Sequence, residues 1–527
     1  MARVLIVTGK LAEPIIRKVL AEAKTEHVVD VVVTPVPVAA FLTTEYIAEY
    51  LKRFDLRSYD YILIPGLARG SGGVVEEAVG IKTVKGPVNA YDLVEILKLP
   101  DLNILSPDVP ADEVLRELIE KQNIEILKQI EGSLNDVNSV VVGKLRIPKN
   151  PPPIRVATEI PEAHMLSKEK LVEEAVKSIE NGADLIVLGF DALKPHVQEV
   201  SEAVKILKKE VEVPIAVDTS IPSEINAAIC AGADMVVNID LTNIDRVTYI
   251  DKEVAVVTTP RDPLTGAIPK DPSTRVKLLE KAVVVIRDRG FEKIFADPVL
   301  EPFGYMFSSL LAYYIFKQRN SEIPLLAGIG NVTELIDADS IGVNASMVML
   351  AQELSISVVL VVEKSTKAEG STLETKVASQ MAALAHYKGS PPKNLGLSLL
   401  VVKDKKLYRE EFGVSYDTVI EAYTGEESYT MDPLGVFRIR VNHELGYIEA
   451  LYTGRKGRIL IRGRSAKAIQ NEIIKRELVS QLTHAMYLGR ELIKAEIALQ
   501  LHKSYVQDKP LFTKPKYIKI RAKEAAF

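Results

Sequence analysis

The sequence has few of the residues on which disulfide-bonded and cysteine-rich metal proteins depend. Its 527 residues include a single cysteine, Cys230, and no tryptophan. One cysteine excludes an internal disulfide and any metal site built from several thiolates. Cys230 falls within an apolar helical pattern, which predicts a small buried side chain.

Neither sign of charge dominates, and no apolar run is long. The 66 Lys and Arg residues nearly balance the 71 Asp and Glu residues, which predicts no general attraction to nucleic acid or to a membrane surface. The longest apolar runs, such as residues 355–363, have the length of a strand and are too short to span a bilayer. The N-terminus lacks the pattern of a secretion signal. We therefore expect a cytoplasmic protein.

Strand and helix patterns alternate over residues 1–148. Apolar, β-branched runs and helical patterns follow one another, which predicts a Rossmann-like, doubly wound α/β domain. The candidate strands are 2–9, 28–36, 59–66 and 140–145, and the clearest helical patterns are 13–23 and 112–130.

A proline-rich segment then precedes eight further strand candidates. Residues 146–155 hold four prolines, which mark a domain boundary after residue 148. Helical segments of suitable length separate the strand candidates of residues 149–365, which predicts a (β/α)8 TIM barrel. An open doubly wound sheet is the alternative. The candidate strands are 154–159, 183–190, 213–218, 233–240, 254–259, 293–298, 323–328 and 357–363.

The pattern changes again after the barrel. Residues 364–395 predict a helix flanked by polar, proline and glycine residues. Runs that alternate in the manner of antiparallel strands follow, and then one long helical pattern at 467–502. Residues 366–527 therefore read as a separate α+β domain with a long helix. The candidate strands of this domain are 395–404, 436–444, 447–454 and 457–465.

Polar side chains close several of the otherwise apolar barrel strands. One such residue is typically a helix cap or a turn residue. Several at the same rim are typical of an active site, because chemistry in TIM barrels takes place at the carboxyl ends of the strands. The residues concerned are Asp218, Thr219, Asn238, Asp240, Asp297, Glu301, Asn331, Thr333 and Glu363.

The histidines, in contrast, show no metal-ligand spacing. They are scattered along the chain, so the sequence predicts no metal site. Only His164 lies near the rim where the first barrel strand is expected to end. The others considered are His196, His386, His443 and His484.

Residues 215–240 carry a resemblance to a known family. The stretch IAVDTSIPSEINAAICAGADMVVNID resembles the Asp-Thr … Ala-Gly-Ala-Asp … Asn-Asp core of the pterin-binding family. That family contains dihydropteroate synthases and methyltetrahydrofolate-dependent corrinoid methyltransferases. The whole arrangement resembles archaeal dihydropteroate synthase-related proteins, which carry extra N- and C-terminal domains. The resemblance implies a pterin-binding barrel and a homodimer.

The resemblance also implies roles for individual residues. Asp297 would hold the amino-pyrimidine edge of a pterin, and Asn238 and Asp218 would complete the cradle. All three would take part in catalysis. The chemistry agrees, because a carboxylate can accept both donors of the 2-amino and N3–H edge. Asn331, in Gly-Ile-Gly-Asn-Val, resembles the Asn that hydrogen-bonds the pterin near N5 in corrinoid methyltransferases. Candidate anion-binding cations are Arg261 and Lys270, in the segment 258–272, and Lys364.

The chain departs from synthases where they hold diphosphate and where a Lys contacts the pterin carbonyl. Residues 156–167 replace the synthase loop whose Asn helps to hold diphosphate and magnesium, and GIGNVTE lacks the Lys of the Ser-Arg-Lys motif. Where synthases have Arg-Xaa-His, this chain has Lys364 and Lys367, which could substitute electrostatically but not in geometry.

Three functions stay open. The first is a transferase of folate or tetrahydromethanopterin biosynthesis that joins a hydroxymethyl-dihydropterin diphosphate to an arylamine, with Mg²⁺ bound to the diphosphate. The second is a methyltransferase that uses a methyl-tetrahydropterin and a corrinoid protein as acceptor. The third is a non-catalytic pterin-binding protein. All three expect a reduced pterin, as substrate or cofactor, at Asp218, Asn238 and Asp297.

Overall fold

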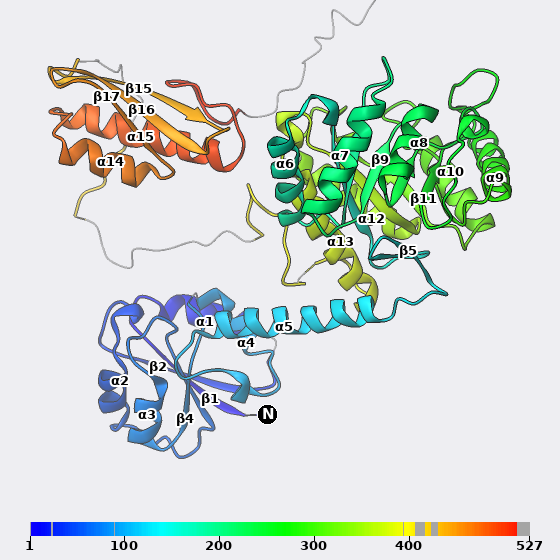
Figure 1. The fold of residues 1–527 in the computed structure, drawn as a ribbon. Coiled ribbons are helices and arrows are strands. Elements are labelled where there is room, and N and C mark those ends of the chain that lie inside the picture. Colours follow the sequence, from blue (N-terminus) through cyan, green and yellow to red (C-terminus); the bar gives the residue numbers. More distant parts are fainter. Residues whose placement is uncertain are drawn as a thin grey trace, which may run out of the picture. The chain divides into compact units, whose positions relative to one another are not determined.

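The computed structural model describes residues 2–22, 25–88, 90–393, 395–405, 417–422 and 431–513. They belong to two compact units (Figure 1). The first contains a four-stranded sheet and a closed barrel, and the second contains a three-stranded sheet together with residues 333–340 and 362–371. Within these ranges, no helix is long and apolar enough to cross a membrane.

The first sheet is parallel, with the strand order β2-β1-β3-β4. Leu5 and Val7 of β1 pack with helices α2 and α3, whereas Val4 and Ile6 pack with α1 and α4 on the other face. Because both faces are covered, the doubly wound α/β prediction is confirmed. The elements are β1 (Arg3–Thr8), α1 (Glu13–Glu22), β2 (Val28–Val33), α2 (Thr44–Leu51), β3 (Tyr61–Ile64), α3 (Gly72–Val79), β4 (Lys82–Lys85), α4 (Leu93–Ile96) and α5 (Ala111–Gly132).

The predicted strand at 140–145 does not join this sheet. It forms an antiparallel hairpin from β5 (Ser139–Val142) and β6 (Leu145–Pro148), with Gly143 in the left-handed turn at φ 56°. The fourth strand of the sheet is instead β4, whose sequence KTVK has too weak an apolar pattern to have been recognised. The prediction of 140–145 as a strand of this sheet was wrong, because sequence periodicity does not say which strands pair.

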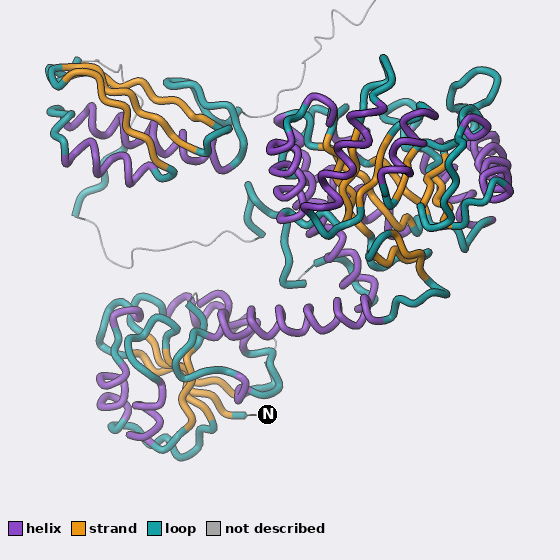
Figure 2. The backbone as a smooth tube through the Cα atoms, viewed as in Figure 1, coloured by secondary structure: helices purple, strands orange, loops and turns teal. Residues whose placement is uncertain are grey.

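Eight parallel strands close into a barrel. Helices surround these strands, as Figure 2 shows. Each strand coincides with one of the eight predicted, so the TIM barrel is confirmed and the open sheet is wrong. The strands are β7 (Arg155–Ile160), β8 (Leu185–Gly189), β9 (Ile215–Asp218), β10 (Met235–Val237), β11 (Ala255–Thr258), β12 (Lys293–Ala296), β13 (Leu325–Gly328) and β14 (Ile356–Val362). The helices are α6 (Lys168–Glu180), α7 (Val197–Glu210), α8 (Pro222–Ala231), α9 (Pro272–Asp288), α10 (Met306–Arg319), α11 (Gly330–Thr333), α12 (Ser340–Glu353) and α13 (Ser371–Lys388).

The barrel interior is filled with apolar side chains. Val187, Val257 and Phe295 are fully buried there, and Val142 and Ile147 of the β5–β6 hairpin belong to the same cluster. The hairpin covers the amino ends of the strands, since the first residue of β7, Arg155, donates from Nε to the Arg146 carbonyl at 2.9 Å. A filled interior leaves the opposite, carboxyl rim for ligands.

Cys230 corrects the expectation of a buried thiol. The buried stripe of α8 consists of Glu224, Ile225, Ala228 and Ile229, spaced by three or four residues as on one face of a helix. Cys230 falls outside this stripe and is exposed.

The second unit contains an antiparallel sheet in the order β15-β16-β17, with α14 and α15 sharing its buried cluster. The α+β prediction is confirmed. Residues 395–404, however, form no strand, since they have no partner to pair with among the described residues. The elements are β15 (Gly435–Asn442), β16 (Tyr447–Gly454), β17 (Gly457–Gly463), α14 (Ala466–Lys475) and α15 (Leu482–Gln500).

The helix predicted at 467–502 is two helices, because a residue remote in sequence caps the second one. Glu477 adopts the left-handed conformation at φ 50° after α14. Asp432 then accepts hydrogen bonds from the backbone amides of Ser480 at 2.8 Å and Gln481 at 3.1 Å. Burial by itself would raise the pKa of Asp432, but these and further hydrogen bonds hold it far below its usual range.

Candidate functional site

Two polar side chains join the carboxyl ends of neighbouring strands. Asp218 is the last residue of β9, and Asn238 directly follows β10. Nδ2 of Asn238 donates to Oδ1 of Asp218 at 2.5 Å. Burial raises the pKa of Asp218, whereas this hydrogen bond and the positive charge of Arg261 lower it. The two predicted residues therefore form one polar unit at the rim.

The backbone of Asn238 is held in an uncommon conformation. Its φ is 70°, in the left-handed region that Asn tolerates better than most residues. Asn243, which is almost fully buried, donates from Nδ2 to the carbonyls of Asn238 at 2.8 Å and Ser220 at 3.1 Å. Asn243 thereby fixes the loops after both strands. Sequence reasoning missed it, although its place three residues after Asp240 is typical of a local side-chain cap.

Asp297 follows β12, another strand of the closed barrel. Burial raises the pKa of Asp297 to about 6, against hydrogen bonds from Tyr313 and Val299 that lower it. The negative charge of Asp218 adds to the rise, so the two carboxyl groups lie close enough to interact. Both hydrogen bonds reach Oδ1, and within the described residues Oδ2 accepts none.

Tyr313 orients the Asp297 carboxylate from behind. It is fully buried on α10 and its hydroxyl donates to Oδ1 of Asp297. Burial, together with the neighbouring carboxylate, raises the pKa of Tyr313 well above its usual value, so the hydroxyl stays protonated as a donor. From sequence, a tyrosine in an apolar helix is expected to be a core residue. Only the packing of α10 shows that Tyr313 donates a hydrogen bond to Asp297.

The loop that begins at Asp297 is strained and clamped. Val299 has a φ of 66°, which is unfavourable for a β-branched residue. Its N–H donates to Oδ1 of Asp297 at 2.7 Å, and its carbonyl accepts from Nη1 of Arg275 at 2.8 Å. The strain is therefore offset by contacts that also orient the Asp297 side chain.

Arg275, which sequence reasoning missed, is fully buried on α9 and connects two loops of the rim. Its guanidinium donates to the carbonyls of Pro269 at 2.5 Å and Pro298 at 3.1 Å, and it forms an ion pair with Glu301. The planar fork of an arginine suits several acceptors at once. Arg275 is therefore a positioning residue for the segment that carries Asp297.

The two predicted loop cations have different surroundings. Nε of Arg261 lies 3.3 Å from Oδ2 of Asp240, but its N–H is not aligned for a hydrogen bond and has no other partner in the described part of the chain. Lys270, in contrast, forms an ion pair with Glu301 and lies 4.3 Å from the ring centroid of Tyr305. Of these two cations, Arg261 is therefore the one whose positive charge lowers the pKa of Asp218.

The two other predicted residues lie after the last strands. Asn331, on α11, donates from Nδ2 to the Leu300 carbonyl at 3.0 Å, which connects it to the loop that begins at Asp297. Lys364 is exposed two residues beyond β14, in the second compact unit.

Some of the scattered histidines meet in space. His164 and His196 lie together with Asp191 on the loops after β7 and β8. Glu224 of α8 connects the loop that carries His196 to the end of β9. Its Oε1 accepts from the His196 amide at 2.6 Å, and its Oε2 accepts from the hydroxyl of Thr219, the residue that follows β9.

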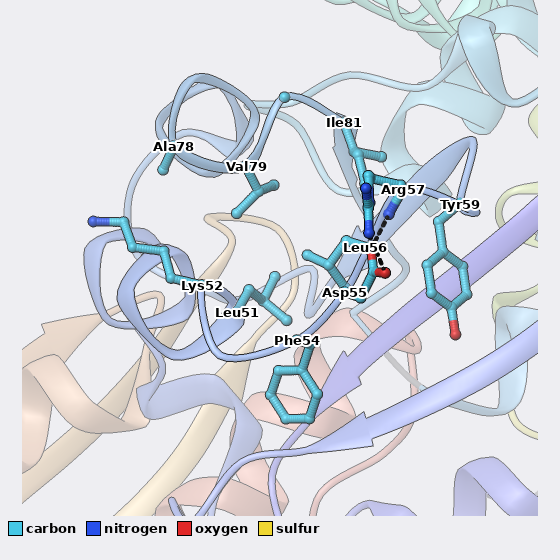
Figure 3. A pocket seen from close by; sticks show the side chains of 11 residues that line it. Leu51, Lys52, Phe54, Asp55, Leu56, Arg57, Tyr59, Ala78, Val79 and Ile81 are labelled. Atoms are coloured by element: carbon cyan, nitrogen blue, oxygen red, sulfur yellow. Dashed lines mark hydrogen bonds and ion pairs between the residues drawn. The ribbon is translucent and has the colours of Figure 1, made fainter.

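A separate hollow of about 540 Å³ lies where α2 and α3 end (Figure 3). It opens at the amino edge of the four-stranded sheet, whereas ligands of doubly wound sheets bind at the carboxyl edge. Of its charged residues, Asp55 and Arg57 bind each other at 2.8 and 3.0 Å, and Lys52 binds Glu49 at 2.8 Å. We therefore assign it no ligand.

Comparisons with known proteins match three parts of the chain to families. Residues 159–336 match a family described as pterin binding enzyme. Residues 2–88 match a family of unknown function, DUF6513, and residues 431–508 match the family PterinBD-DUF4346.

One relative extends over the whole chain. An uncharacterised protein of Methanocaldococcus jannaschii is 37% identical over 525 residues, which cover 97% of this chain and 99% of that protein. Among solved structures, the dihydropteroate synthase of Xanthomonas albilineans with 7,8-dihydropteroate is 20% identical, with a TM-score of 0.37, over 48% of this chain and 100% of its own. That of Yersinia pestis with a pterine-sulfa conjugate is 16% identical, with a TM-score of 0.39, over 47% and 99%. The chain belongs to the pterin-binding enzyme family and shares its full length with an archaeal relative.

Proposed function

We propose that the protein binds a reduced pterin at the carboxyl ends of β9, β10 and β12. This proposal rests on the hydrogen bond between Asn238 and Asp218, and on the Asp297 carboxyl group, which lies close enough to Asp218 to interact with its charge. The 2-amino and N3–H donors of a pterin suit the Asp297 carboxylate, and the Asn238 amide suits an edge that both donates and accepts.

The reaction that fits this rim is synthase-like transfer from a hydroxymethyl-dihydropterin diphosphate to an arylamine. A C–N bond forms between the amine and the pterin methylene carbon, the C–O bond to diphosphate breaks, and the amine releases a proton. Arg261 supports this choice, because its Nε–H lacks a hydrogen-bond partner in the described residues and its charge acts on Asp218. A cation beside the cradle would stabilise the departing anion, with Mg²⁺ accompanying the diphosphate.

A methyltransferase is the second candidate. It is favoured by the ion pair of Lys270 with Glu301, which leaves one loop cation fewer for a diphosphate. It is also favoured by Asn331, whose side chain bonds the loop that begins at Asp297. The donor would be a methyl-tetrahydropterin and the acceptor a corrinoid protein. A non-catalytic pterin-binding protein would need only the cradle.

Calorimetric titration of the full chain distinguishes these functions. The ligands are 6-hydroxymethyl-dihydropterin diphosphate, with and without Mg²⁺, and methyl-tetrahydromethanopterin. Asp297→Asn is compared with Glu212→Gln, a matched carboxyl-to-amide change at a side chain that is 93% exposed.

Each outcome has one meaning. Magnesium-dependent binding of the diphosphate that Asp297→Asn removes and Glu212→Gln retains, followed by product formation with an arylamine, supports the synthase. Binding of the methylated pterin alone moves the assignment to methyl transfer, and binding without turnover of either ligand moves it to a carrier. If neither ligand binds, the pterin site proposed at Asp297 is wrong.

A further inference from the structure

We infer that His164, Asp191 and His196 bind a divalent transition-metal ion such as Zn²⁺, at a site separate from the pterin cradle. Nε2 of His164 and Nε2 of His196 each lie 3.0 Å from Oδ2 of Asp191. Asp191 follows β8, His196 directly precedes α7, and His164 lies in the short helix Ala163–Met165 after β7. Two neighbouring loops of the barrel rim therefore supply the three ligands.

The spacing of the donor atoms suits one ion. All three lie within 4.8 Å of one another. Around a tetrahedral Zn²⁺ with bonds of about 2.0–2.1 Å, ligand atoms stand about 3.3 Å apart. The two distances of 3.0 Å between each Nε2 and Oδ2 of Asp191 are close to this value. Three protein ligands leave one tetrahedral position for water or a substrate oxygen.

The chemistry of the donors selects the class of metal. Two imidazole nitrogens and one carboxylate oxygen suit ions such as Zn²⁺, Co²⁺ and Fe²⁺. Mg²⁺ and Ca²⁺ prefer oxygen ligands alone. This ion would therefore differ from the Mg²⁺ that accompanies a diphosphate.

Without a cation, the cluster contains a buried polar atom that lacks a hydrogen-bond partner in the described residues. The two imidazole rings stack with centroids 3.9 Å apart, and their side chains are only 9% and 2% exposed. The contact of His196 with Oδ2 of Asp191 has the geometry of a hydrogen bond, whereas that of His164 is a close contact only, and Nδ1 of His164 is buried without a hydrogen-bond partner in the described residues. One divalent ion would bind both imidazoles and the carboxylate at once.

Surrounding groups hold the ligands in place, as around known metal sites. The Leu193 amide donates to Oδ1 of Asp191 at 2.8 Å, which leaves Oδ2 turned toward the histidines. Oε1 of Glu199 lies 4.0 Å from Nδ1 of His196, where a small rotation of this half-exposed side chain would make it an acceptor. The Phe190 ring lies 6.2 Å from that of His164 and forms an apolar wall.

The test measures metal binding to the untagged full chain, in the absence of pterin. The protein is freed of metal with a chelator, titrated with Zn²⁺, and analysed for bound metal after gel filtration. We expect one ion per chain, and a loss of affinity of about tenfold or more in His164→Gln and in Asp191→Asn. His386→Gln, at an exposed position on α13, is the matched control and should bind as the wild type does.

Cobalt substitution provides a second, spectroscopic readout. Co²⁺ at a four-coordinate site with two nitrogens should give strong visible absorption, which His164→Gln should abolish. Weak octahedral bands, or equal binding by wild type and His164→Gln, would overturn the inference. No pterin is present in this experiment. A failure to bind metal would therefore leave the proposed pterin function unchanged, and a failure to bind pterin would leave the metal-binding result valid.

Discussion

The side-chain amide of Asn238 donates a hydrogen bond of 2.5 Å to the carboxylate of Asp218, and so joins the ends of β9 and β10. Neither residue is needed for the packed barrel interior, which is apolar. The pair defines one side of the cradle proposed for a pterin, and its geometry depends on the left-handed backbone of Asn238.

Two substitutions of Asn238 should separate backbone strain from ligand binding. Asn238→Gly and Asn238→Ala both remove the hydrogen bond to Asp218, so both should weaken pterin binding in calorimetry. Only alanine is strained at a φ of 70°. We expect Asn238→Ala to have a free energy of unfolding about 1 kcal/mol below that of Asn238→Gly, measured by urea unfolding followed by circular dichroism. Equal stabilities would contradict the assigned backbone conformation.

Arg275 should matter far more for stability than Lys270, although both form ion pairs with Glu301. Arg275 is fully buried and donates to several acceptors, so Arg275→Met should cost about 3 kcal/mol or more in urea unfolding. The Lys270 side chain is 52% exposed, and Lys270→Met should cost less than about 1 kcal/mol. If both variants lost a similar free energy of unfolding, the burial of Arg275 would not explain its contribution to stability.

Pterin affinity should rise with pH through about 6, because the ionised form of Asp297 accepts the pterin donors and its pKa is raised to about 6. Stability should respond in the opposite direction. The folded-state pKa exceeds the unfolded value of about 3.9, so the folded state holds its proton more tightly. The free energy of unfolding should therefore fall between about pH 4 and 6, by at most about 1.4 kcal/mol per pH unit.

The control for this pH dependence is Asp297→Asn, which cannot titrate. Its affinity should be low at every pH, and its free energy of unfolding should lack the part of the slope that wild type shows between pH 4 and 6. Identical slopes in the two proteins would contradict the raised pKa of Asp297.

Tyr313→Phe should move the pH midpoint of pterin binding upward. The Tyr313 hydroxyl donates to Asp297 and lowers the pKa of that carboxyl group, so its removal should raise the pKa further. Tyr314→Phe, at the next residue of α10 with an exposed side chain, is the matched control and should leave the midpoint unchanged. A midpoint that stays in place in both variants would exclude Tyr313 as a positioning residue.

Much of the fold could be read from the sequence. Parallel barrel strands are buried on both faces, so each forms a short apolar run, and all eight runs were recognised. The errors arose where local pattern and pairing disagree. Residues 395–404 have the pattern of a strand but pair with no strand in the described part of the chain, and the helix predicted at 467–502 is interrupted by a cap from Asp432.

The barrel, the family and the polar residues that end the barrel strands could be inferred from residues 154–363 alone, because they follow from local periodicity and from motifs contiguous in the chain. Which remote side chains contact these polar residues depends on how the helices and strands pack. Arg275 and Tyr313 reach the Asp297 loop because α9 and α10 pack beside it. His164 meets Asp191 because β7 and β8 are neighbours in the barrel. Such contacts depend on chain closure over long separations, which residue spacing does not encode.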